Sequence, residues 1–177
     1  MNHKQSCILD VETANGSWSS FPEGFDLLLI GLRVDSDYML FTAESSSLEE
    51  LQLFLKGFRG NVVTYSGTSF DLPLLNTYLH RVLGLTLEIS QHFDILEEIK
   101  NIVGFRISLD RVSQYTFGGQ KIPWNHRSNM KTWLDAPEKQ IDYNRVDLDL
   151  TFELYQRVLA RQHLFLGNTS ILLTLPQ

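Results

Sequence analysis

Two carboxylates near the start of the chain have the types and the spacing for metal chemistry. Asp10 and Glu12 are separated by one residue within residues 8–13, an apolar run with the character of a buried β-strand. Successive strand side chains point to opposite faces, so the two acids project together. An unpaired buried carboxylate is costly, and hard divalent cations prefer oxygen ligands, so the pair predicts a divalent-metal site. The alternative is a strand end where both acids meet solvent.

Two further acids follow later in the chain, each at the start or on the face of an expected helix. Asp71 opens a helix expected over residues 70–82, directly after a strand and a glycine-containing loop. Parallel neighbouring strands would bring its carboxyl group to the tip of the first strand; otherwise it is an ordinary helix-start acid. Tyr143 and Asp147 are four residues apart, so they share one face of a helix expected over residues 137–163. A solvated helix edge is the alternative for this pair.

The order of the expected elements indicates an α/β fold with a mixed sheet. A short turn joins the second and third strands and predicts an antiparallel hairpin, whereas the helix before the fourth strand predicts that this strand is parallel to the first. The sequence Ser47-Leu48-Glu49-Glu50 is a capping box that predicts a helix start at Ser47. The expected strands are residues 8–13, 26–34, 38–42 and 61–65, and the later helices begin near residues 70, 95, 108 and 137.

Three segments of the second half of the chain are less regular. His92-Phe93-Asp94 is expected to lead directly into the helix that begins at residue 95, with Asp94 as its cap. Residues 121–133 are expected to be irregular and basic. Residues 168–177 are apolar, and the sequence leaves open whether they form a last strand or a docked tail.

The amino-acid composition limits the classes of protein to which this chain can belong. The chain has 177 residues, 43% of them hydrophobic, which predicts one globular domain over residues 1–177. Its single cysteine, Cys7, excludes an internal disulfide and fits a reducing, cytoplasmic location. No signal peptide or membrane-spanning run is recognisable. The net charge of −6 argues against a broad basic face that coats nucleic acid, while it permits an enzyme that holds a few phosphates through metal ions and a local basic patch.

The basic segment is the candidate for such a patch. Lys121, His126, Arg127 and Lys131 lie close to Trp124 in the sequence. Cations that contact phosphates and an indole that stacks on a base would together hold a substrate. The alternative is a surface loop whose tryptophans pack on the core, because tryptophan is usually well buried.

Taken together, the motifs resemble those of the DEDD superfamily of 3′–5′ exonucleases, which has a ribonuclease H-like, or DnaQ-like, fold. The tyrosine of Tyr-x-x-x-Asp makes the chain similar to the DEDDy subgroup. The YprB-like predicted exonucleases are the most similar, through Thr64-Tyr65-Ser66-Gly67, Ser69-Phe70-Asp71-Leu72-Pro73-Leu74-Leu75 and Tyr143-Asn144-Arg145 with Asp147. Their second motif usually reads Tyr-Asn-Gly, so Ser66 departs from the pattern. The resemblance implies a mixed central sheet, its first three strands antiparallel and its fourth parallel to the first, flanked by helices.

The resemblance also implies a reaction. It implies that Asp10, Glu12, Asp71 and Asp147 bind two divalent ions, Mg²⁺ or Mn²⁺, and that Tyr143 orients the attacking water. The implied substrate is a single-stranded DNA or RNA 3′ end, hydrolysed by a two-metal-ion mechanism. Residues expected to contact the substrate are Thr13, Ser66, Phe70, Lys121, Trp124 and Arg127.

Two other functions fit the same fold. One is a catalytically weak or inactive ribonuclease H-like module that binds nucleic acid or docks a partner. The intact acids argue against this function. The other is a ribonuclease H-like endonuclease. The Tyr-x-x-x-Asp motif argues against this function. The motifs fix neither the choice between DNA and RNA nor the oligomeric state.

Overall fold

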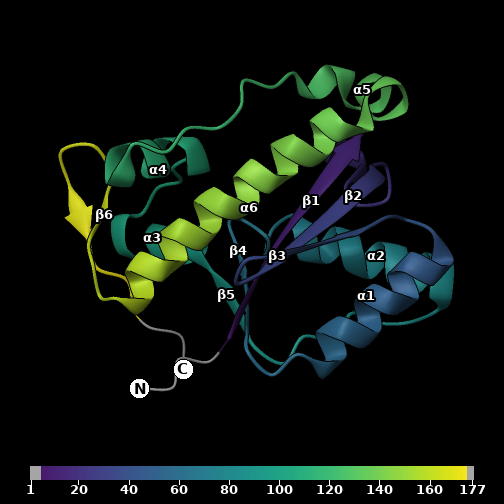
Figure 1. Cartoon of the computed structure of the whole chain (residues 1–177), viewed down its shortest axis with the longest axis horizontal. Helices are drawn as coiled ribbons and strands as arrows, with labels where there is room; N and C mark the ends of the chain where they lie inside the picture. Colours follow the sequence, from purple (N-terminus) through teal and green to yellow (C-terminus); the bar gives the residue numbers. More distant parts are fainter. Residues whose placement is uncertain (1–4, 175–177) are drawn as a thin grey trace.

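A mixed five-stranded sheet forms the centre of the protein (Figure 1), for which a computed structural model describes residues 5–174. The strand order is β3-β2-β1-β4-β5. β1 pairs antiparallel with β2, and β2 with β3, whereas β4 is parallel to both β1 and β5. The predicted α/β fold with a mixed sheet is confirmed. The strands are β1 (Ser6–Ala14), β2 (Asp26–Val34), β3 (Asp37–Phe41), β4 (Asn61–Thr64) and β5 (His92–Asp94).

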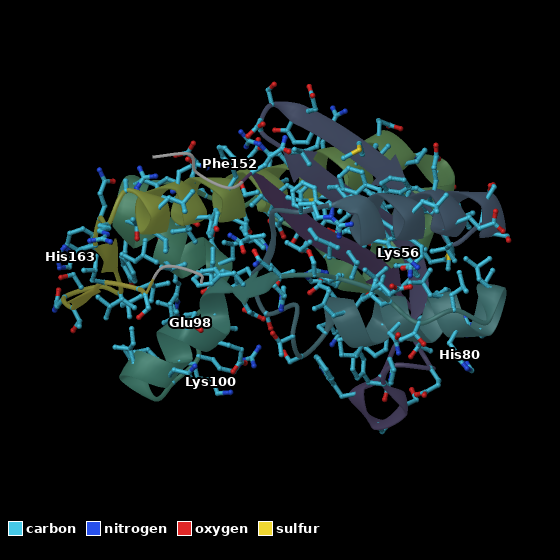
Figure 2. All side chains as sticks on the ribbon, turned by 90° about the horizontal axis from the view of Figure 1, so that it is seen from below. Lys56, His80, Glu98, Lys100, Phe152 and His163 are labelled. Carbon is cyan, nitrogen blue, oxygen red and sulfur yellow. The ribbon has the colours of Figure 1, made fainter. Side chains whose placement is uncertain are left out.

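Helices flank the sheet, and the longest of them, α6, crosses it diagonally (Figure 1). Figure 2 shows Lys56 of α1 and His80 of α2 at one end of the molecule, and Glu98 and Lys100 of α3 at the other. Among the described residues, no helix combines the length and the apolar character needed to span a membrane. The helices are α1 (Ser45–Gly57), α2 (Asp71–Leu83), α3 (Ile95–Val103), α4 (Leu109–Phe117), α5 (Asn129–Asp135) and α6 (Pro137–Leu159).

The alternation of β1 side chains divides the core into two layers. Cys7, Leu9 and Val11 belong to a buried cluster that includes the apolar faces of α1 and α2. Ile8 belongs to a second cluster, which includes the apolar faces of α3, α4 and α6. Asp10 and Glu12 continue the Ile8 face of the strand, so the chain directs both acids toward the side covered by α6.

Two features near these elements differ from the prediction. The capping box does not start α1, because the helix begins at Ser45 and Ser47 lies within its first turn. Ser47 Oγ instead accepts a hydrogen bond from the backbone N–H of Thr42 at 2.8 Å, which joins the helix to the chain leaving β3. His92–Asp94 leads directly into α3 as predicted, but it also forms the strand β5, which was not predicted, since the edge of β4 offers its backbone groups a parallel partner. Asp94 caps α3 as predicted.

The second half of the chain differs from expectation in three places. The segment predicted to be irregular contains α5, whose Met130 and Trp133 pack against buried residues of β1 and β2. The last long helix ends at Leu159 rather than near residue 163, because Arg161 takes a left-handed backbone conformation with φ of 53°. The following residues form a small antiparallel pair, β6 (Leu164–Phe165) and β7 (Ser170–Ile171). Of the two alternatives for residues 168–177, the structure shows a strand, at residues 170–171. Residues 175–177 lie outside the described chain.

Candidate metal centre

The acidic pair lies where β1 extends beyond its parallel neighbour. β4 pairs only with Ser6 to Ile8, so the later part of β1 has an open edge on that side, while β2 continues to pair as far as Ala14. Asp71, the first residue of α2, fills part of this open edge. Its Oδ1 accepts a hydrogen bond from the backbone N–H of Val11 at 3.0 Å. The structure therefore brings Asp71 beside the acidic pair and uses one of its oxygens to satisfy the strand.

α6 brings a third carboxylate to the pair. Carboxylate oxygens of Asp10, Glu12 and Asp147 all lie within 4.8 Å of one another, and we call these residues the acidic cluster. Glu12 is 4% and Asp147 5% exposed. Among the described residues, none donates a hydrogen bond to the buried Asp147 Oδ1. Three converging oxygen donors, one of them unpaired, fit the ligand preference of Mg²⁺ or Mn²⁺.

The electrostatics of the cluster favour a bound cation. Burial, and then the charges of Glu12 and Asp147, raise the pKa of Asp10 well above its usual range. Burial followed by repulsion from Asp147 raises the pKa of Glu12 to about 8. Burial also raises the pKa of Asp71 to about 7, although the Val11 hydrogen bond opposes the change. Ionising all of these groups is therefore unfavourable unless a positive charge lies among them.

A lysine and a tyrosine lie at the edge of the cluster. The Lys121 ammonium forms an ion pair with Asp147 and lies 5.2 Å from the centroid of the Tyr143 ring. Burial disfavours the charged ammonium, but the carboxylate of Asp147 outweighs it and raises the pKa of Lys121. Burial, followed by the charge of Asp147, raises the pKa of Tyr143 to about 12. Tyr143 is therefore a neutral phenol, and hence a hydrogen-bond donor, at neutral pH.

Two buried amides hold the acids, and the sequence reasoning missed both. Asn144 Nδ2 donates to Asp10 Oδ2 at 2.8 Å, and Gln140 Nε2 donates to Glu12 Oε2 at 2.8 Å. Both amides are fully buried. The sequence does contain a signal for these two amides, because residues 140, 144 and 147 place polar side chains on one face of a helix that is otherwise apolar there.

Close packing of α6 on β2 supports this arrangement. A Cβ atom at Gly31 would overlap the Asn144 side-chain amide and lie 2.9 Å from Leu148 Cδ1. Gly31 pairs with Asp10 across the β1–β2 ladder. The absence of a side chain at this position lets α6 approach closely enough for its amide to reach the Asp10 carboxylate.

A cavity of about 590 Å³ lies beside Glu12, and we call it the aromatic cavity. Of the residues predicted to contact substrate, Thr13, Phe70 and Arg127 line it. Trp18 and Phe25, which the sequence reasoning did not select, also line it, and their ring centroids lie 5.5 and 5.4 Å from that of Phe70. Trp18 is 70% exposed, so a large aromatic surface faces the cavity mouth beside the acids.

The remaining predicted contacts lie elsewhere around the cluster. Ser66 and Lys121 line a second cavity together with Asp10 and Asp147. Trp124 stacks on the Tyr143 ring with centroids 4.6 Å apart, and its Nε1 donates to Asn129 Oδ1 at 2.7 Å. Asn129 in turn donates from Nδ2 to the Thr13 carbonyl at 2.7 Å. The indole therefore supports the tyrosine and the end of β1, an arrangement close to the alternative in which the tryptophan packs on the protein.

A comparison with solved structures identifies the fold. No protein-family model matches the sequence, and a search of curated proteins finds no significant match. The family B DNA polymerase of the hyperthermophilic archaeon Pyrobaculum calidifontis is similar in structure, with a TM-score of 0.69 and 18% identity over 88% of this chain. The matched region is 24% of the polymerase, so this chain spans about a quarter of its length. At this identity the likeness shows the fold alone, and it confirms the predicted ribonuclease H-like fold.

Proposed function

We propose that this chain is a metal-dependent 3′–5′ exonuclease of the DEDDy type, most similar to the YprB-like group. Its substrate would be the single-stranded 3′ end of a nucleic acid, and one domain would carry the activity. The observation that carries the proposal is the convergence of Asp10, Glu12 and Asp147 oxygens within 4.8 Å, from two segments far apart in the sequence. Similarity to the fold of a DNA polymerase supports a nucleic-acid substrate.

The acidic cluster would hold the catalytic cations. Asp10, Glu12 and Asp147 supply converging oxygens, and Asp71 beside Val11 would complete the ligand set for a pair of Mg²⁺ or Mn²⁺ ions. When bound, such ions lower the pKa of a water nucleophile and stabilise negative charge on the leaving oxygen. Asn144 and Gln140 orient the carboxylates without neutralising them, because an amide donates a hydrogen bond but carries no charge.

Tyr143 and Lys121 act on the other reacting groups. The Tyr143 pKa of about 12 leaves its hydroxyl protonated, so the phenol orients the attacking water rather than removing its proton. Trp124 and His126 contact the Tyr143 ring and hold it in place. Lys121 brings a positive charge to the cluster, where it would contact the phosphate that the acids would otherwise repel.

The aromatic cavity would receive the terminal nucleoside. Phe70 and Trp18 offer ring faces for a base, since stacking on aromatic side chains is how single strands are commonly bound. Thr13 and Arg127 line the same cavity and would contact the sugar and phosphate. A nucleoside seated there would have its 5′ phosphate beside Glu12, which is where a 3′–5′ exonuclease cleaves.

An end-labelled oligonucleotide tests the proposal directly. With Mn²⁺ or Mg²⁺, a 5′-labelled single strand should give a ladder that shortens from its 3′ end. Asp147→Ala should lower kcat/KM at least roughly 100-fold, since even residues behind metal ligands contribute 10–100-fold. Asp142→Ala, an exposed acid on the same helix, is the matched control and should change little. Internal cuts would indicate an endonuclease, binding without cleavage would indicate a binding module, and full activity of Asp147→Ala would exclude this site.

A further inference from the structure

A second cavity, of about 390 Å³, opens on the acidic cluster, and we call it the basic cavity. The cluster contributes Glu12 to the aromatic cavity and Asp10 and Asp147 to the basic cavity, so it lies at the junction of the two. A polynucleotide with one phosphodiester at the cluster must place a nucleotide on each side of it. The two cavities therefore accommodate the two flanks of the cleaved bond.

The two cavities differ in chemistry. The aromatic cavity is the larger, and Trp18, Phe25 and Phe70 give it ring surfaces suited to a base. The basic cavity contains Arg106 and Lys121 close to the hydroxyl groups of serine residues. A guanidinium and an ammonium beside hydroxyl donors suit a phosphate rather than a base. This difference assigns the terminal nucleoside to the aromatic cavity and the next phosphate toward the 5′ end to the basic cavity.

Arg106 is held in place yet retains free donors. It lies between α3 and α4, where its Nη2 donates to Ser66 Oγ at 2.6 Å and its Nη1 lies 3.9 Å from Glu97 Oε1. The side chain is 53% exposed. A guanidinium has five N–H donors in a fixed fork, so these two contacts leave donors to reach an incoming oxygen. The Tyr65 hydroxyl donates to the Ile107 carbonyl at 2.7 Å and ties the segment next to Arg106 to the end of β4.

Ser66 also lines the basic cavity, and its loop is held by hydrogen bonds. Its φ of 76° is a left-handed conformation that a side chain disfavours. Asp94 holds the loop in this conformation, because its Oδ1 accepts from the Ser66 N–H at 2.9 Å and its Oδ2 accepts from the Thr68 N–H at 2.8 Å. The loop thereby keeps the Ser66 hydroxyl against the Arg106 guanidinium, facing the cavity shared with Asp10.

We propose that the basic cavity is a subsite for the phosphodiester one nucleotide 5′ of the scissile bond, with Arg106 as its principal contact and the Ser66 hydroxyl as a second donor. The inference rests on the proposed function, which places the scissile bond at the acidic cluster. It makes the substrate a strand of at least three nucleotides, because a dinucleotide has no phosphodiester to place in this cavity. The contact would also offset the repulsion between the acids and the approaching strand.

Binding of chemically altered strands tests the subsite separately from catalysis. Fluorescence anisotropy would measure the affinity of a labelled single strand in Ca²⁺, and of the same strand with a neutral methylphosphonate at the second linkage from its 3′ end. We expect the methylphosphonate to weaken binding to the wild type roughly tenfold, the loss expected for one charge-assisted hydrogen bond. The Arg106→Ala protein should bind the normal strand more weakly than the wild type by the same factor. It should bind the altered strand no more weakly than the wild type does.

Two further variants sharpen the comparison. Arg106→Lys keeps the charge but loses the fork, so its affinity should lie between those of the wild type and Arg106→Ala. Arg59→Ala removes an arginine next to Lys56, which Figure 2 shows at the α1 and α2 end of the molecule, and should change neither affinity. A methylphosphonate effect that persists undiminished in Arg106→Ala would overturn the proposal, as would an equal effect of a methylphosphonate at a linkage further toward the 5′ end. A strand that shows this position-specific loss but is never cleaved in Mn²⁺ would retain the subsite and exclude the exonuclease.

Discussion

Replacing Glu12 by glutamine should stabilise the metal-free protein at alkaline pH, although it removes a proposed metal ligand. Glu12 is 4% exposed and faces two other carboxylates, so burial followed by the charge of Asp147 raises its pKa from an ordinary 4.5 to about 8. A raised acid pKa means that the folded protein holds a proton that the unfolded chain has released. The associated stability is present below pH 4.5 and is lost as the pH rises toward 8.

The size of this loss of stability follows from the difference between the two pKa values of Glu12. A rise from 4.5 to about 8, at about 1.4 kcal/mol for each pH unit, gives a loss of roughly 4–5 kcal/mol by pH 8. Glutamine has the same shape and keeps an oxygen to accept the hydrogen bond from Gln140 Nε2, but it never ionises. Allowing for relaxation of the cluster, Glu12→Gln should raise the melting temperature at pH 8 by about 5–12 °C, and by little at pH 5.

Thermal unfolding in a chelator at pH 5 and pH 8 measures this difference. Glu49→Gln is the matched control, because Glu49 is an exposed glutamate on α1. It should leave the melting temperature unchanged at both pH values. A Glu12→Gln protein that gains no stability between pH 5 and pH 8 relative to the wild type would refute the reasoning that this carboxylate is destabilised by its surroundings.

Three further predictions concern the cation and the residues that support its site. Mn²⁺ at about 100 times its dissociation constant should raise the melting temperature of the wild type at pH 8 by roughly 5–10 °C, measured by calorimetry, and should raise that of Glu12→Gln much less. Asn144→Ala should lower the exonuclease kcat/KM roughly 10–100-fold, because Asp10 loses the donor that orients it. Gly31→Ala should lower the free energy of unfolding in urea by roughly 1–3 kcal/mol, since the new methyl group would meet Asn144 and Leu148.

The sequence predicts the arrangement of the sheet and the acids because both depend on short-range patterns. The alternation within residues 8–13 places Asp10 and Glu12 on one face, and the structure directs that face toward α6. The four-residue spacing from Tyr143 to Asp147 likewise places both on the buried face of α6, where a solvated edge was the alternative. Periodicity identifies such faces without knowledge of what packs against them.

The parts that the sequence does not predict depend on contacts between distant segments. β5 is three residues long, too short to show alternation, and forms because β4 provides an edge. The capping box fails because Ser47 bonds to Thr42 rather than to its own helix. Arg106 attracts no notice in the sequence, since its position beside the acidic cluster depends on a hydrogen bond to Ser66, 40 residues earlier.

The choice of amides behind the acids is itself informative about function. A buried carboxylate is most simply stabilised by an arginine or a lysine, and Lys121 pairs with Asp147 in this way. Asp10 and Glu12 instead accept hydrogen bonds from amides, which do not cancel the charge that a cation needs. Asn144 and Gln140 orient Asp10 and Glu12 and leave them charged when the proton is lost. The raised pKa values of Asp10 and Glu12 are the consequence, since the neutral partners compensate only part of the burial. A site selected for stability alone would not keep these costs, whereas they are expected in a site that binds a cation.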